Sequence, residues 1–177
     1  MPFPESFATT RLRAERLTAG HRSELRRMHS DPAVMAYLGG LQSETETAEY
    51  LARNLRHWAD YHFGLWILHE IGGDVPIGRA VLRHVLIDDV DEVEVGYGFY
   101  PEYWGRGLAT EVTIACLEFG FRQLGLESIV ALASPTNLAS HHVLLKAGLV
   151  LEREFDNHGA RCSLFRIRGI PSPGTPS

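Results

Sequence analysis

The feature that most limits the possible folds of this chain is an alternating strand followed closely by a glycine-containing loop and a long helix. Residues 92–99 alternate between apolar and polar or glycine positions, which predicts a strand, and a helical pattern covers roughly residues 107–124. Between them lies the segment Trp104-Gly105-Arg106-Gly107-Leu108-Ala109-Thr110. Glycine lets a backbone approach a ligand closely, and a helix start offers unpaired N–H groups and the positive end of its dipole. Two interpretations of the segment are open at this point: a tight turn that only caps the helix, or an anion site suited to a pyrophosphate.

The remaining pattern predicts an α/β fold with a mixed sheet. Residues 65–68, 76–86 and 92–99 are expected to form a meander of three antiparallel strands. Further strands are predicted at 11–14, 128–133, 149–155 and 162–168, the last two joined by a hairpin turn at Asn157-His158-Gly159. Helices are predicted over 17–28, after the start signal Ser30-Asp31-Pro32 up to Leu38, from the capping box of Ser43 and Glu46 to about Tyr61, and over 138–146.

Composition narrows the class of protein. The 177 residues, 45% of them hydrophobic, predict one globular domain over residues 1–170 with a Pro/Gly/Ser-rich tail at 171–177. A net charge of −5 argues against a nucleic-acid partner. Two cysteines in unrelated contexts and scattered histidines predict neither a disulfide scaffold nor a metal site. The N-terminus has no signal-peptide pattern and no apolar run is long enough to span a membrane, so we expect no membrane partner and a cytoplasmic location.

Several motifs, in order along nearly the whole chain, resemble the GNAT N-acetyltransferases. Gly107-Leu108-Ala109 fits the end of that family's coenzyme loop, Gln/Arg-x-x-Gly-x-Gly/Ala. The RimJ/RimL branch, which includes enzymes that acetylate ribosomal-protein N-termini, is resembled more closely by Glu94-Val95-Gly96-Tyr97, Pro101 and the stretch Trp104 to Glu111. The segments Thr10–Arg13, Asp31–Met35, Asn137–Ser140 and Lys146–Leu149 extend the resemblance from about residue 8 to 168. It implies a mostly antiparallel seven-stranded mixed sheet flanked by helices, with strands 92–99 and 128–133 splayed apart.

The resemblance also implies the cosubstrate, acetyl-coenzyme A, with no metal. Its pyrophosphate would lie on the loop from Trp104 to Thr110, and its amide-like arm would pair with the edge of strand 92–99, which ends at Phe99. Asn137 and Lys146 belong to the second coenzyme segment. The first loop position, Gln or Arg in the wider family, is Trp104 here, as is usual for the branch.

Acetyl transfer to an amine needs a base for the ammonium and a proton donor for the departing thiolate. Glu94, where family members often carry a catalytic glutamate, is the base candidate, acting directly or through water; Glu92 is the fallback, and substrate anchoring or a solvated position is the alternative. Many family members carry an acidic tyrosine seven residues after the equivalent of Asn137, but that position is Leu144. Some relatives in the branch use a serine three residues after that asparagine, which makes Ser140 the thiolate partner, with ordinary packing as the alternative.

Four further side chains are candidates for an acceptor pocket, and each has core or rim packing as its alternative: Tyr37, Trp66, His84 and Tyr97. For Tyr97, which points away from Glu94 on an alternating strand, a core position is favoured. The acidic run Asp88-Asp89-Val90-Asp91-Glu92 is expected to be a solvated turn, and it would favour a cationic amine if it faced the acceptor.

The sequence therefore predicts an acetyl-coenzyme A-dependent N-acetyltransferase that transfers the acetyl group directly within a ternary complex. The acceptor is a primary amine, either a protein N-terminus or a small molecule, and the chain is a monomer or a homodimer. The alternative is an acyl-coenzyme A-binding module, such as a sensor, that does not turn over.

Overall fold

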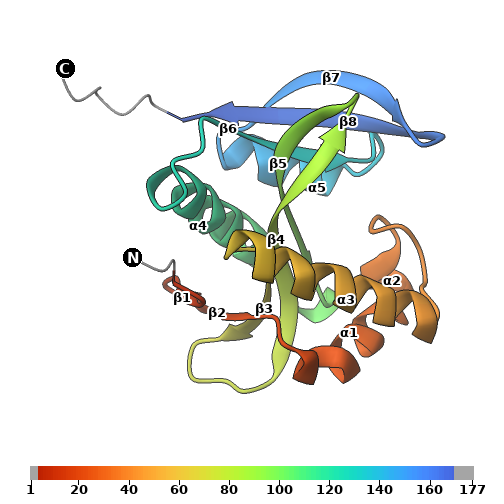
Figure 1. Ribbon diagram of the computed structural model, residues 1–177, viewed down its shortest axis with the longest axis vertical. Helices are drawn as coiled ribbons and strands as arrows, with labels where there is room; N and C mark the ends of the chain where they lie inside the picture. Colours follow the sequence, from red (N-terminus) through yellow and green to blue (C-terminus); the bar gives the residue numbers. More distant parts are fainter. Residues whose placement is uncertain (1–3, 170–177) are drawn as a thin grey trace.

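A mixed sheet of eight strands runs through the protein in the order β1-β2-β3-β4-β5-β6-β8-β7 (Figure 1). The computed structural model describes residues 4–169. Neighbouring strands pair antiparallel except for β5 and β6, which are parallel. The strands are β1 (Phe7–Ala8), β2 (Leu12–Arg16), β3 (Leu65–Glu70), β4 (Pro76–Ile87), β5 (Val90–Phe99), β6 (Ser128–Ala133), β7 (Val150–Asn157) and β8 (Ala160–Arg168).

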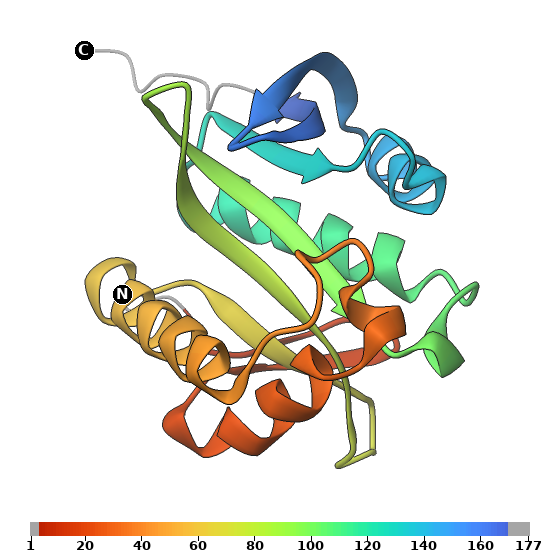
Figure 2. The ribbon, with the colours of Figure 1, turned by 90° about the vertical axis from the view of Figure 1, so that its right-hand side faces the viewer.

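The parallel strands β5 and β6 are paired at a single position. β5 pairs with β4 over its whole length, from Val90 to Phe99, but its register with β6 contains the single pair Glu94 and Val130. Beyond that pair the two strands diverge, as the yellow-green and cyan strands of Figure 2 show. The edge of β5 after Glu94 is therefore free of strand pairing on the β6 side within the described residues.

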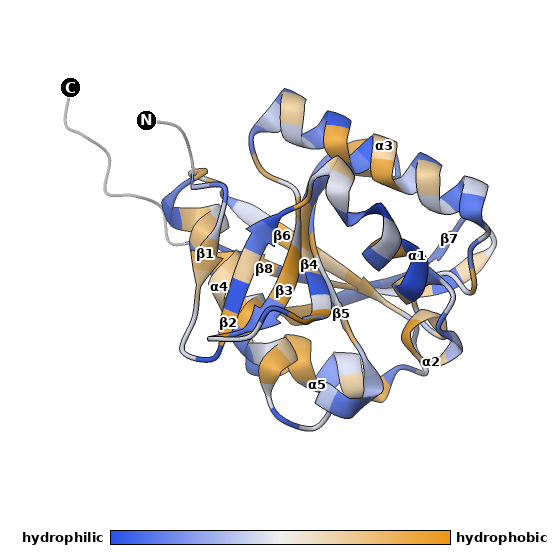
Figure 3. Cartoon of the chain, turned by 90° about the horizontal axis from the view of Figure 1, so that it is seen from below, coloured by the Kyte–Doolittle hydropathy of each residue, from blue (hydrophilic) through white to orange (hydrophobic). Residues whose placement is uncertain are grey.

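Helices cover both faces of the sheet (Figure 3). One face carries α1 (Arg22–His29), α2 (Pro32–Met35) and α3 (Glu44–Tyr61); the other carries α4 (Leu108–Arg122) and α5 (Leu138–Lys146). The expected start signals are present: the Asp31 carboxylate accepts hydrogen bonds from the N–H groups of Ala33 and Val34. Ser43 and Glu46 form the reciprocal capping box of α3, at 3.1 and 2.6 Å.

The core joins the two helical layers through the sheet. Trp66 of β3 is fully buried and meets Trp58 of α3 edge-on at 5.5 Å between ring centroids. Phe119 of α4 contacts the same indole at 5.5 Å. Because one strand residue touches a helix from each layer, Trp66 fixes the position of both layers relative to β3.

All seven strands expected from the sequence are present, and β1 adds an eighth of two residues. The helix expected over 17–28 is interrupted, because residues Ala19–His21 form a 3-10 turn (η1) before α1 begins. The helix expected up to Leu38 ends at Met35, whose carbonyl accepts from the N–H groups of Leu38 and Gly40. The predicted tail at 171–177 lies outside the described residues.

Glu111, in the first turn of α4, ties that helix to the opening strands. Its carboxylate accepts hydrogen bonds from the Thr9 hydroxyl (2.6 Å) and from the backbone N–H (2.9 Å) and Nε (2.7 Å) of Arg11. Burial raises the pKa of Glu111, but these hydrogen bonds and the charge of Arg11 outweigh it and lower the pKa overall. Since the guanidinium of Arg11 also donates to the Arg106 carbonyl at 2.7 Å, the same contacts hold the loop before α4.

We expect Glu111→Gln to lower the free energy of unfolding by about 1.5–3 kcal/mol at pH 7, because an amide cannot satisfy three donors as a carboxylate does. A carboxyl whose pKa is lowered by folding stabilises the protein above its ordinary pKa and loses that effect as the pH falls through the lowered value. The deficit of the variant should therefore shrink between about pH 5 and pH 3. Urea unfolding at several pH values measures both effects. Glu118→Gln, at an exposed position of the same helix, is the control and should change little.

Candidate active site

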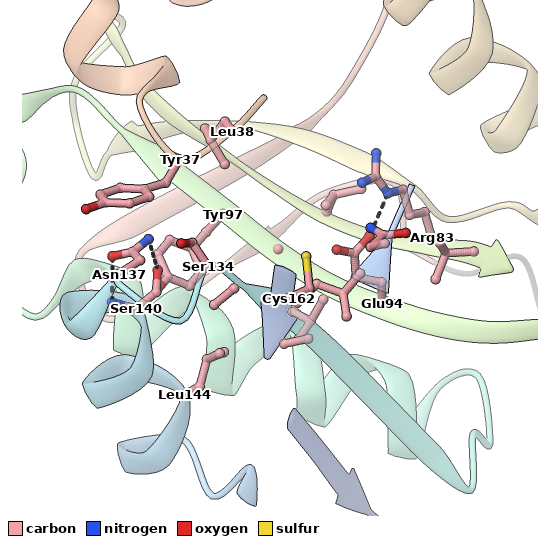
Figure 4. Close-up of a pocket in the computed structure, with 18 of the residues that line it drawn as sticks. Tyr37, Leu38, Arg83, Glu94, Tyr97, Ser134, Asn137, Ser140, Leu144 and Cys162 are labelled. Atoms are coloured by element: carbon pink, nitrogen blue, oxygen red, sulfur yellow. Dashed lines mark hydrogen bonds and ion pairs between the residues drawn. The ribbon is translucent and has the colours of Figure 1, made fainter. Parts of the chain in front are cut away.

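A cavity of about 360 Å³ lies where β5 and β6 diverge. Residues of β4, β5 and β6 form its floor, the segment from Tyr37 to Tyr50 closes one side, and the Ser134–Leu144 region closes the other. Its lining combines an apolar surface with a few polar groups: Gln42, Arg79, Arg83, Glu94, Tyr97, Ser134, Asn137 and Ser140 are among them (Figure 4). Concave sites with few polar groups are typical of small-molecule binding.

Glu94 forms an ion pair with Arg83 in this cavity. The two residues face each other across β4 and β5, and Arg83 Nε donates to Glu94 Oε2 at 2.9 Å. Glu94 is 8% exposed, and its negative charge raises the pKa of Arg83. The pair fixes the orientation of the carboxylate, and no hydrogen bond from the described residues occupies Oε1. Glu94 thus offers the cavity one free carboxylate oxygen.

Glu92, the fallback base, has no such freedom. Both of its carboxylate oxygens accept hydrogen bonds from the guanidinium of Arg166, at 2.7 and 3.0 Å. The same guanidinium also bonds to Glu152, and Glu92 is outside the cavity lining. Both oxygens of this carboxylate are therefore occupied by a partly buried ion pair.

Ser140 is the centre of a second polar cluster, formed with Asn137 and Tyr97. Its hydroxyl accepts from the Tyr97 hydroxyl at 3.0 Å and from Asn137 Nδ2 at 3.1 Å, while its backbone N–H donates to Asn137 Oδ1 at 3.2 Å. A serine hydroxyl has two acceptor positions and one proton. Because both acceptor positions are filled, the Ser140 proton is free to be donated to a third group in the cavity.

Tyr97 is half-buried against the main core and also lines the cavity. It does point away from Glu94, but the divergence of β6 leaves space on that side, and the Tyr97 side chain extends there toward α5 (Figure 4). Burial raises the pKa of Tyr97, and the hydrogen bond to Ser140 lowers it by less. The phenol therefore stays protonated near neutral pH, and its proton is donated in the hydrogen bond to the Ser140 oxygen. Leu144, the position of the missing tyrosine, is 3% exposed and lines the same cavity.

The glycine loop lies outside the cavity, at the start of α4. Gly105 and Gly107 have φ values of +70° and +78°, a region that other residues rarely adopt. The loop from Trp104 to Gly107 is exposed, and nothing lies within 4 Å of a Cβ built at Gly105. The α4 end that carries the loop is on the same side of the molecule as α5 (Figure 2).

Of the other expected coenzyme residues, Asn137 lines the cavity and the rest do not. The Trp104 indole N–H donates to the carbonyl of buried Phe99 at 2.9 Å. Arg106 forms an ion pair with Glu70 at 2.6 Å, so its charge is already compensated. Leu108 is buried, Ala109 and Thr110 are half-buried, and Lys146 is exposed at the end of α5.

Two of the four acceptor-pocket candidates line the cavity, Tyr37 and Tyr97. Trp66 instead belongs to the core, as described above, because its strand position turns it toward α4. His84 lies outside the cavity, stacked on Tyr61 at 4.2 Å and within 3.0 Å of the Asp91 carboxylate.

Sequence reasoning missed the two cavity arginines, Arg79 and Arg83. Arg79 and Arg83 lie at alternate positions of β4, as do Val81 and Val85, so all four side chains point to the same face of the strand. That spacing is visible in the sequence, but which surroundings this face of β4 meets depends on the pairing of β4 with β5.

Within residues 4–169 there is no group of three or more histidine, cysteine or carboxylate side chains placed to hold a metal ion. No helix of that part of the chain is long and apolar enough to cross a membrane.

Comparison with known proteins agrees with this arrangement. The profile of the family described as “Acetyltransferase (GNAT) domain” matches residues 11–150. The chain is 39% identical to the uncharacterized N-acetyltransferase YnaD of Bacillus subtilis over 127 residues. This aligned region covers 71% of each of the two chains. An acetyltransferase structure from Agrobacterium tumefaciens has a TM-score of 0.83 at 23% identity, covering 96% of each chain. A spermidine N-acetyltransferase from Vibrio cholerae, solved with CoA and spermine, has a TM-score of 0.72 at 18% identity, covering 90% of this chain and 96% of that one.

Proposed function

The chain belongs to the GNAT acetyltransferase family, and from that premise we propose that it transfers an acetyl group from acetyl-coenzyme A directly to a primary amine in a ternary complex. The observation that carries the proposal is the cavity at the β5/β6 divergence, with a free carboxylate oxygen of Glu94 and a free hydroxyl proton of Ser140 in one enclosure. Acetyl transfer to an ammonium needs one group of each kind.

The exposed loop before α4 fits the coenzyme's pyrophosphate. Two glycines at positive φ keep side chains out of the way, and the first N–H groups of a fifteen-residue helix are directed at the loop. Because Arg106 is paired with Glu70, the backbone and the helix dipole supply the main attraction, rather than a loop arginine. Asn137, at the start of α5, lines the cavity and offers the arm of the coenzyme a polar side chain.

The free edge of β5 fits the amide-like arm. An extended chain can add to such an edge through backbone hydrogen bonds, and β5 offers one beyond Glu94. The thioester carbonyl would then lie near backbone N–H groups of β5, which stabilise the charge that develops on its oxygen.

Glu94 is the base in this mechanism. Its Oε1 accepts the proton of the acceptor ammonium, directly or through one water, while Arg83 keeps the carboxylate in place through Oε2. Ser140 is the proton donor to the departing thiolate. Tyr97 and Asn137 donate hydrogen bonds to the Ser140 oxygen, so the hydroxyl proton of Ser140 is directed away from both of them. The Tyr97 phenol can pass its own proton to the Ser140 oxygen when Ser140 gives its proton to the thiolate.

The motifs Glu94–Tyr97 and Trp104–Glu111 support membership of the RimJ/RimL-like branch. Acceptors within the proposal are a protein N-terminus or a small amine. An acyl-coenzyme A-binding module without turnover is less well supported, because such a module has no need for a free carboxylate and a free hydroxyl proton in the same cavity.

Acetyl-coenzyme A binding is the first test. At about 100 times its dissociation constant it should stabilise the fold by roughly 2.7 kcal/mol in thermal unfolding, and NADH or ATP at equal concentration should do much less. Gly107→Val should weaken the response, since a β-branched side chain strains a residue at φ +78° and crowds the loop. Gly72→Val imposes similar strain at φ +79° in the β3–β4 turn and is the matched control. No response of the folded wild type at millimolar coenzyme would contradict the proposal.

Glu94→Gln tests the base. The substitution keeps the size of the side chain and removes its ability to accept a proton, so turnover should fall by about 10²–10⁴-fold with coenzyme affinity little changed. Free-thiol release under saturating acetyl-coenzyme A measures the rate, and the acidic limb of the pH–rate profile should disappear. Glu92→Gln on the same strand should retain turnover; an active Glu94→Gln variant with an unchanged pH profile would exclude this role.

Ser140→Ala and Tyr97→Phe test the proton donor. Ser140→Ala should lower turnover roughly ten- to hundredfold, about 1–3 kcal/mol of barrier, with the coenzyme still bound, because the lost hydrogen bond strengthens as the thiolate forms. Tyr97→Phe should have a smaller effect in the same direction. Ser134→Ala alters a cavity serine that bonds to Thr136 instead, and it should be nearly silent. Loss of coenzyme affinity with full turnover at saturation would make Ser140 a binding residue.

A further inference from the structure

We propose that the amine acceptor of this enzyme also carries a carboxylate, and that Arg79 binds that carboxylate inside the cavity. The inference rests on the proposed acetyltransferase function and adds the chemical class of the acceptor.

Arg79 is a buried cation without an acidic partner. It lines the cavity from β4 and is 8% exposed. Its guanidinium donates through Nη1 to His29 Nε2 at 3.2 Å and lies 5.0 Å from the ring centroid of Tyr50. Within residues 4–169 no carboxylate forms an ion pair with it, and its remaining N–H groups have no protein acceptor.

His29 does not compensate this charge, because it is neutral. Arginine can only donate, so His29 Nε2 is the acceptor, and Nδ1 carries the ring proton toward the Thr47 hydroxyl at 3.0 Å. Burial, with the charges of Arg79 and Arg26, lowers the pKa of His29 to about 4. The imidazole therefore orients the guanidinium and leaves its positive charge uncompensated at neutral pH.

The other arginine that lines the cavity, Arg83, is paired with Glu94 at 2.9 Å. Arg26 donates to the carbonyl of Gln42 at 2.7 Å and forms no ion pair within residues 4–169, but it does not line the cavity. The charged residues that line the cavity are Arg79, Arg83 and Glu94, which sum to one positive charge. A buried cation is costly unless a counter-charge accompanies it, and here the open side of Arg79 faces the cavity. An anionic group on the ligand supplies the missing counter-charge.

The register places the two charges at a useful separation. Arg83 faces Glu94 across the strands, and Arg79 faces Gly98, four residues further along β5. Four strand residues span about 13 Å, and the free β5 edge at Gly96 lies roughly midway. An acceptor with its amine at Glu94 and its carboxylate at Arg79 therefore extends along β5, with the Glu94 and Arg79 side chains covering part of the distance. This arrangement fits the first residues of a peptide better than the short amine-to-carboxylate span of a single amino acid.

The acidic run that could have favoured a cationic acceptor lies outside the cavity lining. Asp88 pairs with Arg153, Asp91 lies 3.0 Å from His84, and Glu92 pairs with Arg166. None of the three lines the cavity. A polyamine would bring several positive charges to a cavity that already holds an uncompensated one, so we expect it to be a poor acceptor.

The test compares matched acceptors. Each common amino acid is assayed beside its carboxamide for thiol release from acetyl-coenzyme A, and spermidine is included as a polycation. Peptides with an amidated C-terminus, with and without Asp or Glu at their second position, distinguish a side-chain carboxylate from the free α-carboxylate. We expect the wild type to prefer the carboxylate member of an accepted pair by roughly ten- to hundredfold in kcat/KM.

Arg79→Met should abolish that preference mainly through KM, with the thermal response to acetyl-coenzyme A retained, and Arg79→Lys should restore part of it. Arg53→Met, on the outer side of the same Tyr50 ring at 5.9 Å, is the control and should keep the preference. If Arg79→Met does not fold, the wild-type pairs alone decide. Equal use of acids and amides, or a preference for spermidine, overturns the inference. Absence of coenzyme binding, or coenzyme binding without turnover on any acceptor, overturns the proposed function instead.

Discussion

The single pairing position between β5 and β6 is the constraint on which the rest of this structure depends. β4 holds β5 along its whole length, so the gap opens on the β6 side, after Glu94 and Val130. The gap creates the cavity and leaves a strand edge without a partner. It also lets Tyr97, on the face of β5 opposite to Glu94, extend to Ser140 instead of packing under a neighbouring strand. One interruption in a hydrogen-bonded sheet thus supplies a binding surface and assembles side chains from distant segments.

Charge compensation around this gap is nearly complete, which makes the exception informative. The carboxylates of Glu94, Glu92 and Glu111 each bind an arginine, so these charges fix geometry and add little net field. Arg79 differs, because its nearest polar partner, His29, is neutral. In a buried ion pair each charge offsets much of the desolvation cost of the other, whereas an uncompensated buried cation imposes a cost that a negatively charged ligand can remove. Ligand selection and fold stability are therefore linked at one side chain.

Local features of the sequence predicted most of the fold and part of the site. The capping box of Ser43 and Glu46, the alternating strands and the glycine loop depend on neighbouring residues only, and each is present. The environment of a strand residue depends on register and on what lies across the sheet. For that reason Trp66 turned out to be a core residue, and Arg79 was not anticipated as part of the cavity. Such outcomes require long-range pairing that no single segment encodes.

Leu144 bears on where the proton donor of the proposed mechanism lies. A tyrosine there would reach the cavity from α5, but Leu144 fills that space with a buried apolar side chain. A phenol from β5 instead approaches the same helix and meets it one turn earlier, at Ser140. The serine, close to Asn137 at the start of α5, has its acceptor positions filled from two directions and can only donate outward. In the proposed mechanism, the serine therefore supplies from the start of α5 the proton that a tyrosine at position 144 would supply one turn later.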